Sequence, residues 1–435
     1  MELLRRQVFL GRQVLRHGYL HERYRKAAVY QRSNKKNRSG DFMIELASVT
    51  DCTGCKACGD ACPVNAVKFQ TDAKGFWHPV IDHSACIKCG RCRKTCVVLK
   101  DSQSDIQKTT PVVYSAYSKE FAVREKSTSG GMFYELSAHV ISHGGVVCGC
   151  RFSDDYRAAY HTFAENMDEL EPLLSSKYFQ SDTGGVYRRV RGFLQDGRKV
   201  LFCGAPCQSA ALQRYLPANL LENLITVDFI CLGINSPKGY LKFVDELEDR
   251  YGAKARKVRF KDKSRGWQNL GTKVWFENGK EYYGNRYTDA WVNSYVVGKF
   301  MIRRSCAVCR FKGLPRVSDI TIGDFWGGDY TCDERKNGVS LVLLNSPKGE
   351  ELFRAVQPKL VINKTTLETI GAGNPMMESS VKLNGELQDA FFKRLENEKF
   401  SEVAWSLLHR PVWKRYARWY ADLLKDMVRR AVRGK

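Results

Sequence analysis

The cysteines are the residues of this 435-residue chain with the clearest chemical meaning, because eight of its sixteen cysteines fall into two repeats of one spacing. Each repeat has three cysteines separated by two residues and a fourth after three more. The eight are Cys52, Cys55, Cys58, Cys62, Cys86, Cys89, Cys92 and Cys96. Three closely spaced thiolates wrap one iron–sulfur cube, and a helical turn carries the fourth cysteine to another cube. The spacing therefore predicts two 4Fe-4S clusters.

Because the fourth cysteine of each repeat ligates the cluster of the other repeat, the spacing predicts which ligands belong together. Cys96 should complete the first cluster, bound by Cys52, Cys55 and Cys58, and Cys62 should complete the second, bound by Cys86, Cys89 and Cys92. Small residues such as Gly54 and Gly90 let backbone N–H groups approach the sulfur atoms. The alternative is zinc, but four-cysteine zinc sites usually pair two C-x-x-C units across a longer loop.

Two phrases farther along the chain suit phosphate binding. Ser129, Gly130 and Gly131 precede one predicted helix, and a phrase around Lys177 precedes another. Small residues at a helix N-terminus expose backbone N–H groups to an anion, and a lysine adds charge. The candidate cofactor-binding residues are Ser129, Gly130, Gly131, Lys177, Gln180 and Ser181. The plainer interpretation of both phrases is a turn followed by an N-cap.

Two further phrases follow them: residues 202–208, which link a strand to a helix, and residues 306–309, shortly before residues 319–327. Together and in this order behind the cysteine repeats, the four phrases resemble the beta subunit of coenzyme F-420 hydrogenase/dehydrogenase. The resemblance covers residues 51–344. It implies an iron–sulfur flavoprotein that uses FAD to pass electrons between clusters and a redox partner, often a deazaflavin. Some relatives instead reduce chlorophyll-type pigments. The expected function is an oxidoreductase that connects a ferredoxin-like carrier or deazaflavin with an unidentified substrate; the alternative is a non-catalytic electron-transfer subunit of a larger complex.

The same resemblance implies a third 4Fe-4S cluster. Its family pattern matches Cys207 in a Gly-x-Pro-Cys-Gln turn, Cys231 after a strand, and the pair Cys306 and Cys309. Leu232 stands where the family usually has histidine. From the residues alone, these cysteines could bind a cluster or zinc or be buried thiols. Cys203 is a substitute ligand candidate, whereas Cys148, Cys150 and Cys332 have no partner at ligand spacing.

The elements that must position these residues alternate between strand and helix. The fold class is therefore predicted as mixed α/β or α+β: a ferredoxin-like dicluster domain, a flavin-binding core and a mainly helical C-terminal segment. Strands are predicted at residues 112–117, 145–152, 199–203, 224–231, 319–322 and 338–344, and helices at 132–142, 184–195, 237–251 and from 347. A hairpin is predicted at 272–283 around Asn278-Gly279. Ser181 or Asp182 is the expected N-cap of the 184–195 helix.

The expected domains are a basic N-terminal extension (1–42), partly disordered, the dicluster domain (43–100), the core (111–347) and the helical C-terminal region (348–435). Met43 is an alternative start of translation. Both ends are basic within a net charge of +23. The last segment has an apolar stripe of Val412, Tyr416, Trp419, Tyr420, Leu423 and Met427, which predicts a helix docked on its own core or an interfacial helix.

No apolar run is long enough to span a bilayer, and clustered cysteines in a long chain fit a reducing compartment. The expected location is cytoplasmic, or peripheral at the inner membrane surface. The expected partners are a ferredoxin, flavodoxin or deazaflavin carrier, steered by Lys56, Lys88, Arg91 and Lys94, together with a membrane surface or protein for the basic tail. No motif indicates specific nucleic-acid binding, and no C-x-x-x-C-x-x-C indicates radical chemistry. No catalytic acid or base stands out among Asp324, Lys177 and His143.

Overall fold

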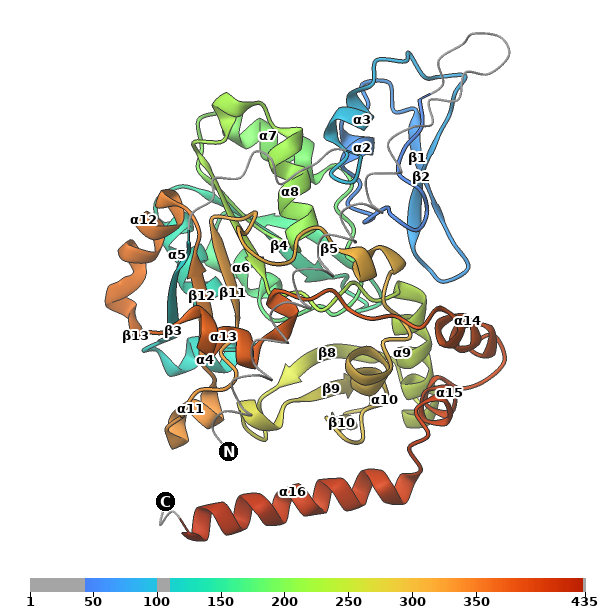
Figure 1. Ribbon diagram of the computed structural model, residues 1–435, viewed down its shortest axis with the longest axis vertical. Helices are drawn as coiled ribbons and strands as arrows, with labels where there is room; N and C mark the ends of the chain where they lie inside the picture. The colour runs from blue at the N-terminus through green and yellow to red at the C-terminus, as the bar shows by residue number, and fades with distance from the viewer. Residues whose placement is uncertain (1–43, 100–109, 433–435) are drawn as a thin grey trace, which may run out of the picture. The chain divides into compact units, whose positions relative to one another are not determined.

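The computed structural model describes residues 44–99 and 110–432 (Figure 1). The predicted basic extension at 1–42 and most of the predicted linker lie outside the described residues. Within the described residues, strands and helices alternate as the sequence predicts. The mixed α/β fold class, with a cysteine-rich region ahead of it, is therefore confirmed.

The cysteine-rich region consists of one hairpin and two very short helices. Strands β1 (Val67–Thr71) and β2 (Trp77–Ile81) pair antiparallel, and the helices are α2 (Ala57–Asp60) and α3 (Arg91–Thr95). Lys56 and Gly90, the residues before the helices, have left-handed backbone with φ of 57° and 69°. Each helical turn thus begins abruptly inside a cysteine repeat, and the fourth cysteine follows it.

An eight-stranded mixed sheet forms the middle of the core. Its order is β13-β3-β12-β11-β7-β6-β4-β5. The strands are β3 (Val112–Ser118), β4 (Val146–Phe152), β5 (Ala159–Ala164), β6 (Val200–Cys203), β7 (Leu224–Phe229), β11 (Ile320–Asp324), β12 (Ser340–Leu344) and β13 (Leu360–Lys364). Strands β11, β7, β6 and β4 run parallel, and the outer pairs are antiparallel. The carboxyl ends of the parallel strands therefore meet at one edge.

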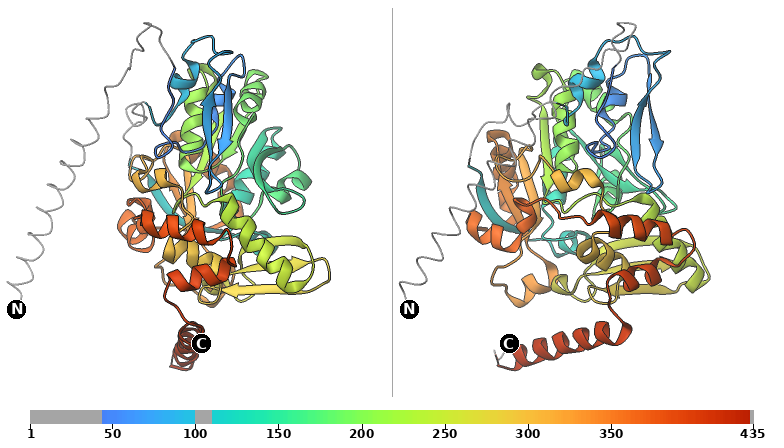
Figure 2. Two further views of the ribbon diagram at one scale, coloured as in Figure 1. Left: turned by 90° about the vertical axis from the view of Figure 1, so that its right-hand side faces the viewer. Right: turned by 45° about the vertical axis from the view of Figure 1, so that its right-hand side comes forward.

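Helices cover both faces of this sheet (Figures 1 and 2). On one face, α5 (Met132–Ser142) and α12 (Pro347–Val356) pack their apolar residues against Val147, Leu201 and Val227. On the other, α7 (Val186–Gln195) and α8 (Pro206–Tyr215) pack against Val146, Val200 and Leu224. Shorter helices are α4 (Phe121–Lys126), α6 (Met167–Leu170), α11 (Cys332–Asn337) and α13 (Leu367–Gly373). The strands are nearly continuous apolar runs because both faces are buried.

A smaller antiparallel sheet makes a second layer of the core. Its order is β10-β9-β8, formed by β8 (Ala255–Asp262), β9 (Gly271–Phe276) and β10 (Glu281–Asn285). Helices α9 (Pro237–Tyr251), α10 (Ala290–Val292), α14 (Gly385–Arg394) and α15 (Phe400–Leu407) share one apolar cluster with it. The predicted hairpin at 272–283 is confirmed as β9 and β10.

One expectation about the later chain needs correction. Residues 360–364 form β13, an edge strand of the large sheet, in a region that was expected to be mainly helical. The last helix is α16 (Val412–Val432), and Val412, Tyr416 and Tyr420 of its predicted apolar stripe are exposed, as are Trp413 and Leu424. This exposure agrees with the second of the two alternatives, an interfacial helix. Among the described residues, no helix is long and apolar enough to cross a membrane.

The N-terminus of α7 is capped from a distant part of the sequence. Its N-cap residue is Gly185, with φ of 79°, and not Ser181 or Asp182. The carboxylate of Asp60, in the cysteine-rich region, accepts hydrogen bonds from the backbone N–H groups of Gly185 (2.7 Å), Tyr187 (2.9 Å) and Arg188 (3.4 Å). Arg188 in turn donates to the carbonyl oxygens of Asp60 (2.7 Å) and Cys62 (2.9 Å). This reciprocal cap fastens the cysteine-rich region to α7.

We expect Asp60→Ala to lower the free energy of unfolding by about 1–3 kcal/mol, because it removes a cap and leaves the buried N–H of Tyr187 without its acceptor. Asp60→Asn should cost less, because one side-chain oxygen remains. Urea unfolding of the anaerobic protein, followed by circular dichroism, measures this. Asp82→Ala is the control, since Asp82 accepts from nearby backbone N–H groups but is exposed. Equal effects of the two alanine variants would contradict the role of Asp60.

Candidate iron–sulfur and flavin site

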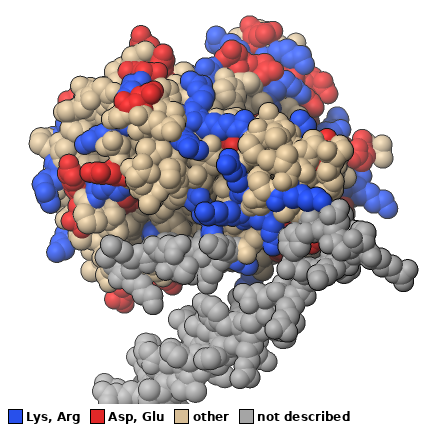
Figure 3. All heavy atoms as spheres, turned by 90° about the horizontal axis from the view of Figure 1, so that it is seen from above, with Lys and Arg blue, Asp and Glu red and all other residues tan. Residues whose placement is uncertain are grey.

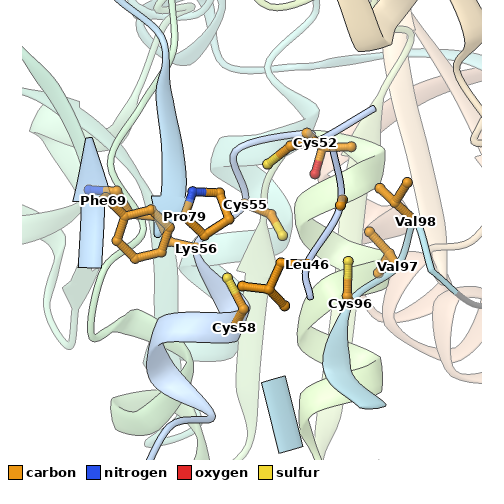
Figure 4. Close-up of a pocket in the computed structure, with 12 residues that line it drawn as sticks. Leu46, Cys52, Cys55, Lys56, Cys58, Phe69, Pro79, Cys96, Val97 and Val98 are labelled. Carbon is orange, nitrogen blue, oxygen red and sulfur yellow. The ribbon is translucent and has the colours of Figure 1, made fainter. Parts of the chain in front are cut away.

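The four cysteines predicted for the first cluster surround one cavity. Cys52, Cys55, Cys58 and Cys96 line it together with apolar residues that include Leu46 and Val97. Figure 4 shows the sulfur atoms of these four residues around the same space. Cys96 comes from the end of α3, Cys58 from α2, and Cys52 and Cys55 from the loop before α2. The structure therefore brings the predicted set together, with its fourth member from the second repeat.

The second predicted set lies next to the first. Burial raises the pKa of the Cys92 thiol, and the neighbouring Cys62 and Cys86 thiols raise it further. Cys62, the fourth cysteine of the first repeat, is thus beside members of the second repeat, as the exchange predicts. Cys89 is the exposed member of this set. Cys58 is influenced by Cys92, so the two sets adjoin.

The core cysteines predicted for a third cluster also converge. Cys207 begins α8 after β6, Cys231 follows β7, and Cys306 and Cys309 lie in or after the 3-10 helix Arg304–Val308. Burial raises the pKa of Cys207, and Cys309, Cys231, Cys55 and Cys306 raise it further. Cys55 belongs to the first set. The three cysteine sets therefore follow one another from an exposed cysteine into the core.

Backbone N–H groups point at a cysteine sulfur in each set. Gly54 donates to Cys52 Sγ (3.3 Å), Ala66 to Cys62 Sγ (3.1 Å) and Ile234 to Cys306 Sγ (3.4 Å). Such bonds stabilise thiolates that carry a cluster and tune its potential. Within residues 44–99 and 110–432, no three Cys, His, Asp or Glu side chains meet closely enough to hold a single metal ion.

The two predicted phosphate-binding phrases lie side by side. The hydroxyl groups of Thr128 and Ser176 are 3.1 Å apart and hydrogen-bonded. Gly131 is the N-cap of α5 with φ of 95°, and as glycine it offers no side chain to the free N–H groups of that helix. Gly130 is held by the sheet, since its N–H donates to Ser340 Oγ (2.9 Å). An added Cβ there would lie 2.5 Å from the Ala116 carbonyl oxygen.

The other three predicted cofactor contacts have protein partners of their own. The Lys177 ammonium donates to the carbonyl oxygens of Leu174 (2.6 Å), Pro172 (3.1 Å) and Ser175 (3.2 Å), and burial lowers its pKa to about 8. Ser181 Oγ accepts from Gln208 Nε2 (3.2 Å). Gln180 is buried against the loop of Gly54. Their contacts with a flavin therefore stay predictions.

Three charged residues, Lys261, Lys263 and Asp324, lie near Ser129. Of these, only Asp324 was singled out from the sequence. Lys263 donates to the Ser129 carbonyl oxygen (3.1 Å), and burial lowers its pKa to about 7. The Asp324 carboxylate forms an ion pair with Lys261 and accepts from Trp267 Nε1 (3.0 Å). Neither Lys261 on β8 nor Lys263 just after it shows a helical or motif signal, so only the fold reveals this group. His143 is exposed at the opposite end of α5 from Ser129.

The remaining cysteines separate into two kinds. Burial raises the pKa of the Cys148 thiol on β4, and the nearby thiols of Cys203, on the neighbouring strand β6, and of Cys150 raise it further. These thiols therefore have neighbours that their sequence spacing did not show. Cys332 is exposed at the start of α11.

Comparison with known families agrees with this arrangement. Residues 51–98 match the family described as "4Fe-4S dicluster domain", so the region carries two 4Fe-4S clusters. Residues 197–369 match the C terminus of "Coenzyme F420 hydrogenase/dehydrogenase, beta subunit". Over these residues the chain is similar to the coenzyme F420 hydrogenase/dehydrogenase beta-subunit family. The resemblance stated from the motifs is thereby confirmed, and the matched region contains Cys207, Cys231, Cys306 and Cys309.

Two individual proteins are similar over parts of the chain. The ferredoxin-type protein NapF of Haemophilus influenzae is 34% identical over 53 residues, which are 12% of this chain. The chain spans 30% of the length of that protein. A chain of the F420-reducing [NiFe] hydrogenase complex from Methanosarcina barkeri aligns with a TM-score of 0.45 at 15% identity, over 70% of this chain and 90% of that one.

We expect wild-type protein to contain about twelve iron atoms per chain, and Cys207→Ser to contain about eight, because only the core cluster loses a ligand. Cys309→Ser should behave in the same way. Iron and sulfide analysis with EPR of anaerobic protein measures the loss. Cys332→Ser is the control and should keep all the iron. Full iron content in Cys207→Ser would remove Cys207 from the ligands.

Proposed function

We propose that this protein is a flavin- and iron–sulfur-dependent oxidoreductase of the coenzyme F420 hydrogenase/dehydrogenase beta-subunit type. Electrons would enter at the dicluster region and reach the core through three cysteine-bound clusters. The observation that carries the proposal is the succession of cysteine sets: the first set lines one cavity, and Cys55 of that set packs in the same cluster as Cys207 and Cys309 of the third. An isolated dicluster carrier has no use for a third set at the end of the series.

The loop around Gly131 is the part of the core that suits a flavin phosphate. The N-terminus of α5 presents backbone N–H groups to an anion, and the helix dipole favours negative charge there. The neighbouring Ser176 phrase supplies a second wall through its bond to Thr128. A bound flavin exchanges single electrons with clusters and electron pairs with an organic substrate. Lys261, Lys263 and Asp324 are the nearby groups able to hold charge beside Ser129.

The alternative function is an electron-transfer subunit that leaves the chemistry to another protein. The matched family is named for a subunit of a hydrogenase or dehydrogenase, which is consistent with a larger complex. The two functions differ in flavin content.

The electron carrier would dock where the second cysteine set reaches the surface. Cys89 is exposed, and Lys88, Arg91 and Lys94 beside it are also exposed. Lys56 is not part of this surface, contrary to expectation, because its ammonium pairs with Asp182 at 2.6 Å. Figure 3 views the side on which the dicluster region lies in Figure 1 and shows basic and acidic side chains intermixed there. Local basic charge around Cys89 therefore decides how an acidic ferredoxin or flavodoxin docks.

Helix α16 is a second candidate docking element. Its exposed Trp413, Tyr416 and Tyr420 share the helix with Lys414 and Arg418, a pattern typical of helices that lie on anionic membrane surfaces. Sedimentation with anionic and neutral vesicles would distinguish a membrane surface from a protein partner.

We expect heat-denatured protein to release about one FAD per chain, consistent with a redox cofactor bound by the core. Gly131→Ala should lower the flavin content, because alanine at φ of 95° strains the loop at the start of α5. Gly144→Ala is the control: its φ of 74° imposes similar strain just beyond the other end of α5. Protein that stays free of flavin after reconstitution with FAD would favour the electron-transfer subunit.

We expect reduction by an acidic carrier to slow as salt rises, because screening weakens steering beyond a Debye length of about 8 Å at physiological ionic strength. Reversing charge with Arg91→Glu and Lys94→Glu together should slow association by roughly tenfold at low salt. Stopped-flow reduction measures both effects. Lys393→Glu, on exposed α14 surface, is the control. A flat salt dependence would show that the carrier does not dock beside Cys89.

A further inference from the structure

Arg303 is a buried cation whose described partners are all neutral. Only 1% of the surface of this residue is exposed. The guanidinium donates to the Cys52 carbonyl oxygen (2.6 Å), the Trp77 carbonyl oxygen (3.0 Å), His78 Nδ1 (3.0 Å) and Gln180 Oε1 (3.4 Å). Because Nδ1 of His78 accepts this bond, its proton is on Nε2, which donates to Asp72 at 3.0 Å.

The other buried arginines of the described residues have carboxylate partners. Arg124 is 5% exposed and pairs with Asp333 at 2.6 Å; Arg316 is 4% exposed and pairs with Asp228 at 3.0 Å. In the part of the chain that the structure describes, no carboxylate lies within ion-pair distance of Arg303. Burying a charge without a counter-charge is strongly unfavourable. The surroundings of Arg303 therefore call for a negative charge that the described residues do not supply.

The position of Arg303 identifies where that negative charge would be. Gly54, between Cys52 and Cys55, is so close that an added Cβ would lie 3.0 Å from Arg303 Nη1. On its other side, the Arg303 carbonyl oxygen accepts from the N–H of Cys306 at 3.0 Å. Arg303 thus lies between the first cysteine set and the third.

We propose that Arg303 is the counter-charge of the first cluster and raises its reduction potential above that of the second. The inference rests on the proposed function, because it requires clusters at both cysteine sets. A cluster held by four thiolates is a net anion and becomes more negative when it takes an electron, so a fixed positive charge beside it favours the reduced form. The step is the transfer of one electron from the second cluster to the first, with no bond or proton transferred. Water screens the charges around exposed Cys89, whereas nothing comparable screens Arg303.

The test is an anaerobic redox titration of the complete protein followed by EPR. In Arg303→Gln, the potential of the first cluster should fall and that of the second should stay. Arg303→Lys keeps the charge and should restore most of the shift, which loss of packing alone would not predict. Arg214→Gln is the matched control: Arg214 also acts on a ligand of the first set, Cys96, but is only half-buried, so the shift should be smaller. Cys89→Ser alters the signal of the second cluster alone and so assigns the two signals.

An unshifted potential in Arg303→Gln with intact clusters would overturn the inference, and so would an equal fall in Arg303→Lys. If Arg303→Gln does not retain the first cluster, the proposal is tested by the order in which the first and second clusters of the wild-type protein are reduced. Reduction of the first cluster before the second supports the counter-charge, and the opposite order refutes it. Iron and sulfide analysis keeps this test separate from the proposed function: a chain without clusters would refute that function, whereas intact clusters with unshifted potentials would refute only the role of Arg303.

Discussion

The contact between the dicluster region and the core is the interaction on which the rest of the structure depends. It combines apolar packing with several polar bonds, most of them partly buried. Asp60 caps α7, Arg188 returns bonds to the carbonyl oxygens around Asp60, and Lys56 pairs with Asp182 while its ammonium lies over the Trp77 ring. Polar bonds of this kind fix orientation more strictly than apolar packing does, because each donor needs its acceptor. The relative position of Cys55 and Cys207 follows from these bonds.

The sheet explains how four core cysteines from distant segments reach one place. Cys207 and Cys231 follow β6 and β7, which are adjacent parallel strands, so both residues leave the sheet at the same edge. Cys306 and Cys309 come from the segment that contains Arg303, and this segment is held to the β7 side by the bond from the Arg303 N–H to the Ile234 carbonyl oxygen (2.8 Å). The backbone thus places all four before any cofactor binds.

Local patterns in the sequence predicted most elements well, because apolar periodicity and turn residues act over short distances. Residues 132–142 and 237–251 are helices at the predicted boundaries, and Asn278-Gly279 joins the predicted hairpin. Strand β13 was missed because it is an edge strand with a half-exposed pattern, and its pairing with β3 is a long-range contact. The predicted N-cap of α7 was wrong for the same reason, because the carboxylate that caps this helix is that of Asp60, far away in the sequence.

In the candidate site, too, short-range features were predictable and long-range contacts were not. The cysteine repeats specify their clusters through spacing, whereas the partners of charged residues were not predictable. Lys56 has the sequence context of a surface lysine, yet Asp182 neutralises it inside the contact between the two regions.

Burial and charge together give the series of cysteine sets a direction. The second set reaches solvent at Cys89, where water and salt weaken the effect of nearby lysines and arginines. The first set is beside a cation that is almost fully buried, Arg303, where the effective dielectric constant is lower and a single charge acts more strongly. Surface charge therefore governs the association rate of a carrier, whereas buried charge governs which cluster holds the transferred electron. A single arginine at the junction can outweigh several basic residues on the surface, because the energy of an electron depends on unscreened charge and not on net charge.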